Sequence, residues 1–268
     1  MFNKKNIVIT GASQGLGQAM AMLLAKHEAN LVLCARSEEN LQSVKENILN
    51  NYPQTKIKIL ALDICEKENN KILIEESLKF LGSIDVFIAN AGKSMWSRFS
   101  DVDDPCDLLD LIKLNFMSVV YASYFSLEHL RKSKGCFLAV SSIQGVLPVP
   151  YHSGYVASKH ALNGFIDTLR LEEPDIHFLL AMPSWIAGTN IRSNALVSHK
   201  QNSVKVNTKH KNNVISKEEC AKIILNALSN NKDYVFIPYK YGFISMIRIF
   251  FRKLVDRIIV NKTNSQLK

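Results

Sequence analysis

The feature that most constrains the fold lies near the start of the chain, where an apolar run enters a glycine cluster and a helix pattern follows. Residues 5–10 read Lys-Asn-Ile-Val-Ile-Thr, which is typical of a buried parallel strand. Gly11, Gly15 and Gly17 come next, and apolar residues recur at helical spacing over 19–24. Glycines at a strand-to-helix turn let backbone N–H groups bind a pyrophosphate. The segment therefore predicts a nucleotide site; a plain tight turn is the alternative.

Strand and helix patterns alternate along the rest of the chain. Apolar runs predict strands near 5–10, 30–35, 56–61, 84–89, 135–141, 176–182 and 233–237, with amphipathic stretches between them. This alternation predicts an α/β fold, with one doubly wound parallel sheet of about seven strands and helices on both faces. No repeat or linker divides the chain, so we expect one nucleotide-binding catalytic domain over 1–240 and a C-terminal extension over 241–268.

A tyrosine and a lysine mark the middle of the chain. Tyr155 and Lys159 are four residues apart in a predicted helix, so both side chains project from one face. An ammonium nearby favours the phenolate and would lower the pKa of Tyr155, which at its ordinary value of about 10 is a poor proton carrier at neutral pH. The pair is typical of acid–base chemistry, although the same spacing also occurs as a plain helix-surface pair.

In their order and context the motifs resemble those of the short-chain dehydrogenase/reductase family, in its compact, single-domain, Rossmann-type branch, across roughly residues 4–240. The resemblance rests on the glycine loop 10–17, Asp63 after the third predicted strand, Asn90-Ala91-Gly92 after the fourth, Asn115 in the next helix, Ser142 after the fifth strand, and Tyr155 with Lys159.

The resemblance implies an oxidoreductase that transfers a hydride between a nicotinamide cofactor and a carbonyl or secondary alcohol, without a metal. Ser142 would donate a hydrogen bond to the substrate oxygen, and Tyr155 would act as general acid or base. Lys159 would hold the nicotinamide ribose and lower the pKa of Tyr155. Asn115 would bind a water that links Lys159 to solvent, or it is a buried amide with satisfied hydrogen bonds. Ser141 is expected to be structural.

The same resemblance assigns a set of cofactor contacts that follow strands at one edge of the predicted sheet. They are Gly11, Ser13, Gln14, Gly15, Leu16, Gly17, Arg36, Asp63, Ile64, Asn90, Ala91, Gly92, Tyr155, Lys159, Pro183, Ile186 and Thr189. Asp63 would contact the adenine, cap the following helix, or do both. The sequence departs from the family pattern after the sixth strand, where Ser184 replaces the usual glycine and Thr189 comes one position late.

The end of the second predicted strand favours NADP(H) over NAD(H). Ala35 stands where NAD-preferring members of the family carry an acid, and Arg36 follows it. A carboxylate would repel the 2′-phosphate, whereas a guanidinium can bind it through two hydrogen bonds. Gln14 replaces the basic residue that many NADP users carry there, so NAD(H) stays an alternative.

Large apolar residues lie in the segments expected to line the substrate cleft: Met95, Trp96, Ile143, Leu147, Val149 and Trp185. Such a lining favours a lipophilic alcohol or ketone, unless several of these side chains belong to the core. We assign substrate contacts to Ser142, Gln144, Trp96 and Trp185. We expect residues 190–215 to form a lid over the cleft, or else a disordered surface loop.

Basic charge is concentrated near the C-terminus, where residues 190–268 hold 15 Lys and Arg against 4 Asp and Glu. Over 241–260 an apolar stripe and four basic residues predict one amphipathic helix, too interrupted by charge to span a membrane. Such a helix makes peripheral membrane contact or covers a subunit of a homodimer or homotetramer. From residue 216 onward this end resembles that of the 11β-hydroxysteroid dehydrogenase type 1 group, whose members act on lipophilic substrates.

Composition favours a cytoplasmic enzyme that does not bind nucleic acid. The five cysteines form no Cys-x-x-Cys pair, which indicates reduced thiols and no zinc site. The first predicted strand begins too early for a signal peptide or an N-terminal membrane span. A pI of 9.2 fits nucleic-acid binding, but no motif for it is present. The remaining alternative is a nucleotide-binding scaffold or redox sensor without turnover, which would typically have lost part of the catalytic set.

Overall fold

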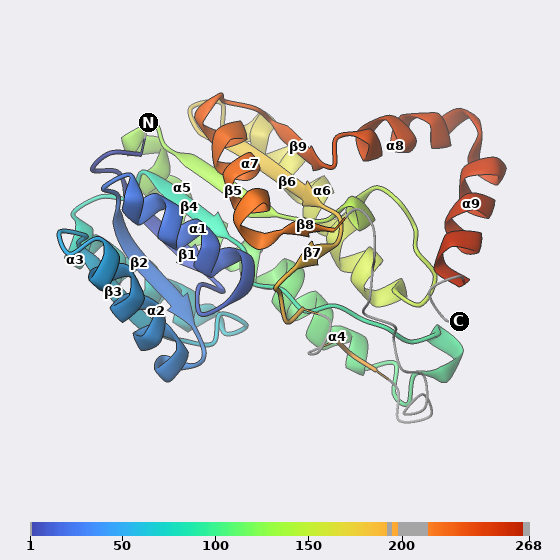
Figure 1. Ribbon diagram of the computed structural model, residues 1–268, viewed down its shortest axis with the longest axis horizontal. Helices are drawn as coiled ribbons and strands as arrows, with labels where there is room; N and C mark the ends of the chain where they lie inside the picture. The colour runs from blue at the N-terminus through green and yellow to red at the C-terminus, as the bar shows by residue number, and fades with distance from the viewer. Residues whose placement is uncertain (1, 192–194, 198–213, 265–268) are drawn as a thin grey trace.

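A parallel sheet of seven strands runs through the described part of the chain, residues 2–191, 195–197 and 214–264 of the computed structural model (Figure 1). Its strand order is β3-β2-β1-β4-β5-β6-β9, and every neighbouring pair is parallel. The strands are β1 (Asn6–Thr10), β2 (Asn30–Ala35), β3 (Ile57–Ala61), β4 (Val86–Ala89), β5 (Cys136–Val140), β6 (His177–Pro183) and β9 (Tyr234–Ile237). The predicted strands and the doubly wound fold class are confirmed.

Helices cover both faces of this sheet. One face carries α1 (Gly15–Lys26), α2 (Glu38–Asn51) and α7 (Lys217–Ser229). The other carries α3 (Lys67–Leu81), α5 (Ser118–Ser133) and α6 (Ser153–Glu172). The short helix α4 (Asp107–Ile112) continues through a π-helical turn, Lys113–Met117, into α5. A separate two-stranded sheet pairs β7 (Ile186–Ala187) with β8 (Ile215–Ser216).

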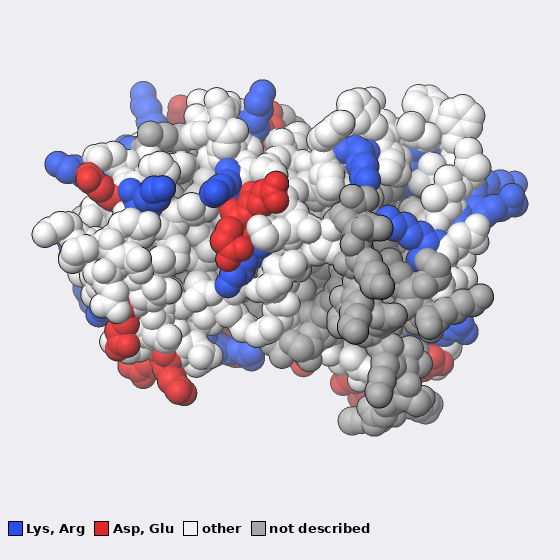
Figure 2. Space-filling view, in the orientation of Figure 1, with Lys and Arg blue, Asp and Glu red and all other residues white. Residues whose placement is uncertain are grey.

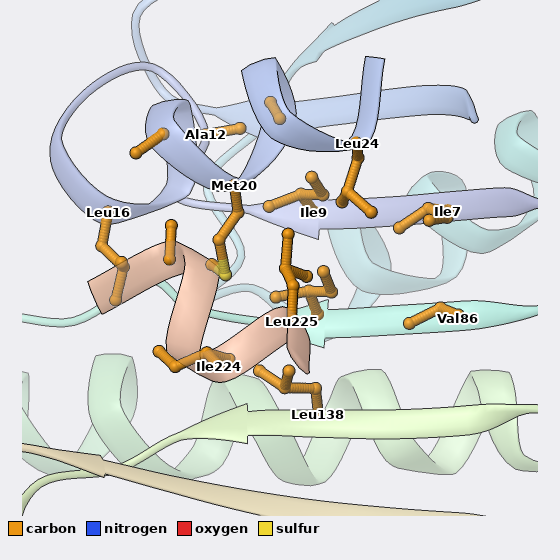
Figure 3. Close-up of a cluster of buried hydrophobic side chains, with 14 of the residues drawn as sticks. Ile7, Ile9, Ala12, Leu16, Met20, Leu24, Val86, Leu138, Ile224 and Leu225 are labelled. Atoms are coloured by element: carbon orange, nitrogen blue, oxygen red, sulfur yellow. The ribbon is translucent and has the colours of Figure 1, made fainter. Parts of the chain in front are cut away.

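Successive side chains of β1 enter opposite halves of the core. Ile7 and Ile9 pack on the α1 and α7 side, and Val8 packs on the α3 side. Figure 3 shows Ile7 and Ile9 packed with Met20 and Leu24 of α1, beside Ile224 and Leu225 of α7. Each such buried Leu or Ile stabilises the fold by about 1.5–3 kcal/mol. The glycine loop follows directly from β1, so this core fixes where the loop begins.

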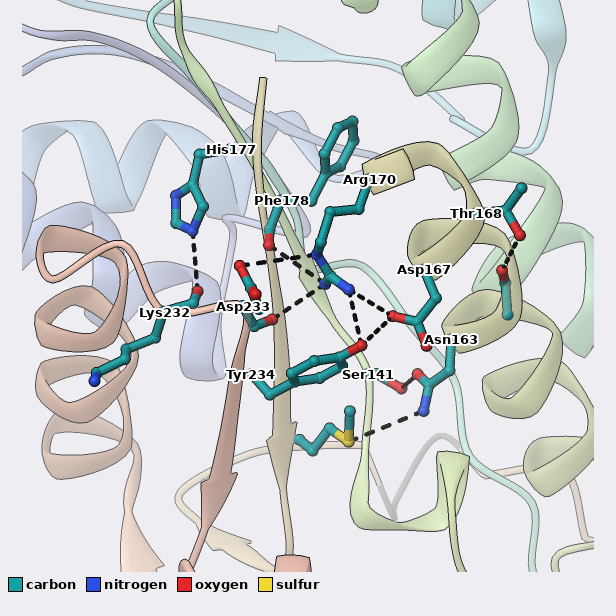
Figure 4. A network of polar contacts seen from close by, with 12 residues as sticks. Ser141, Asn163, Asp167, Thr168, Arg170, His177, Phe178, Lys232, Asp233 and Tyr234 are labelled. Carbon is teal, nitrogen blue, oxygen red and sulfur yellow. Dashed lines mark hydrogen bonds and ion pairs between the residues drawn. The ribbon is translucent and has the colours of Figure 1, made fainter. Parts of the chain in front are cut away.

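Polar contacts fix the C-terminal end of α6 to the sheet (Figure 4). The Arg170 guanidinium donates to Asp167 at 2.9 Å and to the Tyr234 hydroxyl at 2.8 Å, and it lies 4.6 Å from the centroid of the Tyr234 ring. Tyr234 belongs to the edge strand β9 and donates in turn to Asp167 at 2.7 Å. The network therefore ties helix α6 to the last strand.

The C-terminal extension forms two helices, α8 (Lys240–Phe250) and α9 (Arg252–Asn264), where the sequence predicted one. Phe251 between them has φ −121° and ψ 46°, outside the helical range. Arg248 and Asp256 would lie roughly 12 Å apart along a continuous helix. The bend brings Arg248 Nε to 2.7 Å from Asp256 Oδ1 and buries Val255, and Figure 1 shows α9 turning down from the end of α8.

Among the described residues, one stretch, Asp107–Ser133, is long and apolar enough by composition to cross a membrane. In the fold this stretch is α4, the π-helical turn and α5. The face of α5 that carries Val119, Ala122 and Leu130 is buried in the core on the α3 side of the sheet. A core helix of this kind passes the same test, so the stretch carries no membrane argument.

Candidate active site

A cavity of about 900 Å³ lies beyond the carboxyl ends of the central strands. Such crevices are where ligands of parallel sheets bind. Every predicted cofactor residue lines it except Gly17, and it also takes in Ser142, Gln144 and Trp185. Asn115 and Trp96 do not line it. The structure therefore brings together most of the predicted site, and each of the three exceptions has its own geometric cause.

The glycine loop needs two of its glycines for reasons of space. A Cβ on Gly17 would lie 2.3 Å from the Gly11 carbonyl oxygen, so Gly17 lets α1 begin against the loop and does not face the ligand. Gly11 has φ +64°, and a Cβ there would lie 2.8 Å from the Ala91 Cα. At the start of α1, Gln14 is the N-cap and makes no side-chain cap bond. The first amides of the helix therefore face the cavity unpaired by a cap, as an anion site requires.

Asn90 and Thr10 brace this loop from the neighbouring strand. The Asn90 amide donates to the carbonyl oxygens of Thr10 at 3.0 Å and Gly11 at 3.1 Å. The Thr10 hydroxyl accepts from the backbone N–H of Asn90 at 3.1 Å. Thr10 was absent from the predicted site; its position at the last residue of β1, next to the glycines, is the signal that could have found it.

The outer end of the cavity holds Arg36, Ser37, Asn40 and Asp63. Arg36 is exposed and forms no salt bridge with any described carboxylate. Asp63 accepts the Cys65 backbone N–H at 3.0 Å. The expectation that Asp63 caps the next helix is wrong, because α3 begins at Lys67 and its N-cap is Glu66. The Asp63 side chain instead shapes the turn after β3.

Ser142, Tyr155 and Lys159 meet at the inner end of the cavity. The Ser142 hydroxyl hydrogen-bonds Tyr155 and accepts the Gln144 backbone N–H at 3.1 Å. Lys159 Nζ donates to the Val140 carbonyl oxygen at 2.9 Å and lies 5.9 Å from the centroid of the Tyr155 ring. Tyr155 is only 6% exposed and Lys159 only 3%. The three groups lie together where little water reaches, so bulk water competes little for the proton that they would transfer.

The pKa values in this corner correct one expectation. Burial raises the pKa of Tyr155 to about 12, against a smaller lowering by the Ser142 hydrogen bond. Burial lowers the pKa of Lys159 to about 8. The predicted lowering of the Tyr155 pKa by Lys159 is therefore wrong for this structure, because the ammonium is directed at the Val140 carbonyl and desolvation of the phenolate dominates.

Asn115 is fully buried in the π-helical turn. Its Oδ1 accepts the Lys93 N–H at 2.8 Å, and its amide donates to the Lys93 carbonyl at 2.9 Å and to the Ser158 hydroxyl at 3.0 Å. Asn115 thus joins the loop after β4 to α6, and its amide is satisfied without a ligand. Its role in binding a water near Lys159 stays a prediction.

Asn163 positions the serine loop, and sequence reasoning missed it. Its Oδ1 accepts from the Ser141 hydroxyl at 2.6 Å (Figure 4), and its amide donates to the Gly145 carbonyl at 3.1 Å. Both ends of the turn that carries Ser142 are therefore held by α6, the helix that carries Tyr155. Two further helical turns from Tyr155, a buried amide on that helix is the signal that could have found it.

Trp96 lies behind the surface of the cavity and does not line it, so its assignment as a substrate contact is corrected. It is 6% exposed, stacks on Tyr151 at 5.8 Å between centroids, and meets the edge of His152 at 4.9 Å. His152, which the sequence did not single out, also packs edge-on against Tyr155 and Trp185. Met95 and Leu147 are buried too, as the core alternative allowed.

The predicted lid over 190–215 lies largely outside the described residues. Two described parts contact the site. Asn190 donates to the Gln14 side-chain oxygen at 2.8 Å, across the mouth of the glycine loop. Leu196 exchanges backbone hydrogen bonds with the 94–96 segment and packs beside Met95 and Tyr155. The segment after β6 therefore crosses both the loop end and the tyrosine end of the cavity.

Comparison with known proteins gives relatives for this arrangement. The sequence profile of the short chain dehydrogenases matches residues 5–198. An 11-beta-hydroxysteroid dehydrogenase of Pinus massoniana is 32% identical over 257 residues, covering 94% of this chain and 72% of that protein. The 11-beta-hydroxysteroid dehydrogenase-like 4A protein of Arabidopsis thaliana is 32% identical over 250 residues, covering 93% of this chain and 79% of that protein.

Solved structures share the fold. An alcohol dehydrogenase from the archaeon Thermococcus sibiricus, complexed with 5-hydroxy-NADP, has a TM-score of 0.76 at 24% identity, covering 87% of this chain and 95% of that one. A short chain dehydrogenase/reductase from Burkholderia phymatum, in complex with NAD, has a TM-score of 0.80 at 18% identity, covering 94% and 95%. Together, the profile match, the relatives above 30% identity and the fold show that this chain belongs to the short-chain dehydrogenase/reductase family of oxidoreductases, which act on CH–OH groups with NAD(P).

Proposed function

We propose that the chain is an NADP(H)-preferring carbonyl reductase or alcohol dehydrogenase of lipophilic substrates, with Tyr155 as general acid or base. The observation that carries the proposal is one cavity with Ser142, Tyr155 and Lys159 at its inner end and an exposed Arg36 at its outer end. A nucleotide-binding scaffold or redox sensor is the alternative, and it predicts cofactor binding without turnover.

The cavity fits a nicotinamide dinucleotide on its own geometry. Gly11 lets the turn lie against the backbone of Ala91 in the cavity wall, and the uncapped start of α1 offers N–H groups to a pyrophosphate. Arg36 would bind the 2′-phosphate, and Lys159 would bind the ribose near Tyr155. The cofactor would supply or accept the hydride. The residues of this chain would then bind the substrate oxygen and transfer its proton.

In reduction, Ser142 would donate to the carbonyl oxygen and Tyr155 would transfer its proton to that oxygen. The raised pKa of Tyr155, about 12, means that the proton is present throughout the physiological range. The Lys159 ammonium would hold the nicotinamide ribose in place beside Tyr155 while the proton moves. In oxidation the same groups would act in reverse, with the Tyr155 phenolate as the base.

The pH dependence of reduction should follow Lys159. The pKa of this group is about 8, so its charge is present below pH 8 and is lost as the pH rises through that value. We expect kcat/KM for reduction to fall about tenfold per pH unit above pH 8, if only the charged form is active. Lys159→Arg keeps the charge to far higher pH and should remove the fall. Initial rates of reduction from pH 6 to 10 test this. The same fall in kcat/KM above pH 8 in the parent and in Lys159→Arg would contradict it.

The substrate end favours a lipophilic molecule with one further polar group. Ile143 and Trp185 line the cavity beside Ser142. Gln144 lines this cavity, and its buried side-chain oxygen has no hydrogen-bond partner among the described residues. A buried acceptor without a partner costs about 1–3 kcal/mol, and a substrate hydroxyl would relieve that cost once the Gln144 side chain turns toward the cavity. We therefore expect hydroxyl-bearing lipophilic ketones to be better substrates than matched ketones that lack the hydroxyl.

A panel assay tests the proposed function. NADPH and NADH oxidation are followed with steroid, long-chain and aromatic carbonyls, beside sugars and small keto acids as the polar comparison. Turnover of the lipophilic set with NADPH supports the proposal. Turnover of polar substrates alone overturns the substrate class, and cofactor binding without any turnover favours the scaffold.

Arg36→Ala tests the cofactor preference. Loss of a charge-assisted hydrogen bond of about 1.5–3 kcal/mol should weaken NADPH binding by about 10–150-fold, with NADH binding changed less than threefold. Titration of both cofactors into both proteins measures this. Lys45→Ala is a matched control, because Lys45 is another cation on the same βα unit that does not line the cavity. An equal loss of affinity for NADPH and NADH would show that Arg36 does not bind the 2′-phosphate.

For the extension we keep the two predicted uses, a peripheral membrane contact or a subunit contact in a homodimer or homotetramer, and propose a cytoplasmic location. In α8 no residue is buried, and Phe243, Met246, Ile249 and Phe250 are among its exposed apolar side chains. Figure 2 shows Lys and Arg beside uncharged surface over α8 and α9. An exposed apolar surface with basic neighbours suits either partner.

A further inference from the structure

A second cavity, of about 400 Å³, lies between α9 and the loop that precedes α6. We call it the α9 pocket. Its apolar walls come from three separate segments of the chain: Phe99, Val149, Pro150, Val156, Ile259 and Val260. A cavity of this size and character is within the range of small-molecule sites. Neither the proposed reaction nor the cofactor uses it.

Polar groups in the α9 pocket are already engaged. The Ser97 hydroxyl donates to the Arg98 carbonyl at 3.1 Å, and the Tyr151 hydroxyl accepts from Arg98 Nη2 at 3.2 Å. The Asp256 carboxylate accepts from Arg248 Nε at 2.7 Å, and that hydrogen bond holds the pKa of Asp256 below its ordinary value. A ligand in this pocket would therefore contact hydrocarbon and find few free hydrogen-bond partners. This excludes a sugar or a nucleotide, whose polar groups would be buried without partners.

An aromatic wall divides the α9 pocket from the catalytic cavity. Tyr151 lines the pocket and stacks on Trp96, which contacts His152, which contacts Tyr155. Trp96 and His152 are both almost completely buried. No residue that the structure describes lines both cavities. The α9 pocket is therefore a separate site that shares a wall with the active site and is not an extension of the substrate cleft.

The residues around the mouth of the α9 pocket, which we call its rim, indicate the class of ligand that it binds. Phe99 is 60% exposed and Val260 41% exposed, so apolar surface continues from the pocket to its mouth. Arg98 stands between two lining residues, with its guanidinium 5.4 Å from the Tyr151 ring centroid. The lining carboxylate Asp256 is paired with Arg248 and Arg252. Arg98, which hydrogen-bonds the lining residue Tyr151, therefore offers a positive charge beside an apolar interior.

We propose that the α9 pocket binds a single hydrocarbon chain that ends in an anionic head group, as in a long-chain fatty acid. The chain lies against Val260, Ile259 and Val156, and the head group meets the Arg98 side of the rim. This site is independent of the proposed function. Its ligand contacts Tyr151, which holds φ +69°, a conformation that is strained for an aromatic residue, and reaches Tyr155 only through the aromatic wall.

The test uses the full chain and the intrinsically fluorescent fatty acid cis-parinaric acid, at concentrations below its critical micelle concentration. We expect saturable binding with one chain per protein, competed by oleate. Val260→Trp should fill the pocket and weaken binding by about tenfold or more. Ile258→Trp places the same ring two residues away, on a side chain that is 57% exposed and does not line the pocket, and should leave binding within about twofold.

Two further variants locate the head group and exclude the catalytic cavity. Arg98→Gln should weaken oleate binding by about fivefold or more and leave competition by oleyl alcohol unchanged. Tyr155→Phe should bind parinarate like the parent. Equal binding by Val260→Trp and the parent, displacement of parinarate by NADPH, or a signal only above the micelle concentration or with phospholipid vesicles would each overturn the proposal. NADPH titration of every variant reports its fold and tests the proposed function separately.

Discussion

Tyr155→Phe should lower kcat/KM for carbonyl reduction by about 10²–10⁴-fold and leave NADPH affinity within about threefold. The substitution removes one hydroxyl, and with it the proton that Tyr155 would transfer and the hydrogen bond with Ser142. The ring stays in its place, because Met95 and Leu111 pack against it in the same buried cluster. The expected loss is therefore one of chemistry and not of folding. Single-turnover NADPH oxidation, with binding measured separately, gives both numbers.

Tyr124→Phe is the matched control. Tyr124 lies on α5 and is 72% exposed, so the same loss of a hydroxyl should leave turnover unchanged within about twofold. Turnover of Tyr155→Phe at the parent rate would remove Tyr155 from the mechanism. Loss of NADPH binding together with turnover would instead indicate damage to the fold, which the thermal midpoint detects.

Gly17→Ala should weaken NADPH binding by about 100-fold or more. The added Cβ would lie 2.3 Å from the Gly11 carbonyl oxygen and 2.6 Å from the Asn90 amide nitrogen, so the loop and its brace must both move. In a helix, Ala is favoured over Gly by about 1 kcal/mol. The backbone clash outweighs this gain, because overpacking typically costs about 1–3 kcal/mol and here it displaces the anion site itself. Cofactor titration and the thermal midpoint measure the two effects.

Gly164→Ala separates the clash from the helix propensity. Gly164 lies within α6, and a Cβ there would meet no atom within 4 Å. This control should keep full NADPH affinity and raise stability by about 0.5–1 kcal/mol. If Gly17→Ala behaved like Gly164→Ala, the loop would be able to relax, and the interpretation of the glycines as a plain tight turn would gain support.

Local patterns in the sequence were enough to predict the sheet and most of the cavity lining. A parallel strand buried on both faces, such as β1 with Ile7, Val8 and Ile9, reads as a continuous apolar run. The ligand edge then follows from topology, because all carboxyl ends of parallel strands lie on one side. This is why Ser13, Arg36 and Ser142 could be assigned to a single cavity although they follow different strands.

Other features depend on contacts between distant segments, which periodicity does not record. From the sequence, Trp96 could line the cleft or lie buried behind its surface. Its contacts with Tyr151 and His152 show that it lies buried behind the surface. The bend at Phe251 brings together Arg248 and Asp256, which the periodicity of one helix would hold apart. The pKa of Tyr155 depends on how completely it is desolvated, and spacing along a helix reveals only that Lys159 is close.

The anchoring of α6 at both ends has a consequence for how this enzyme could be re-engineered. In its first half Ser158 bonds Asn115, at its middle Asn163 bonds the loop around Ser142, and at its far end Arg170 connects it to β9. Tyr155 and Lys159 therefore lie on one helix that is held along its length, whereas the described residues Asn190 and Leu196 of the segment after β6 contact the site from its two ends. Transplanting residues 184–216 from a relative should exchange substrate preference while the reaction chemistry is inherited intact from the recipient.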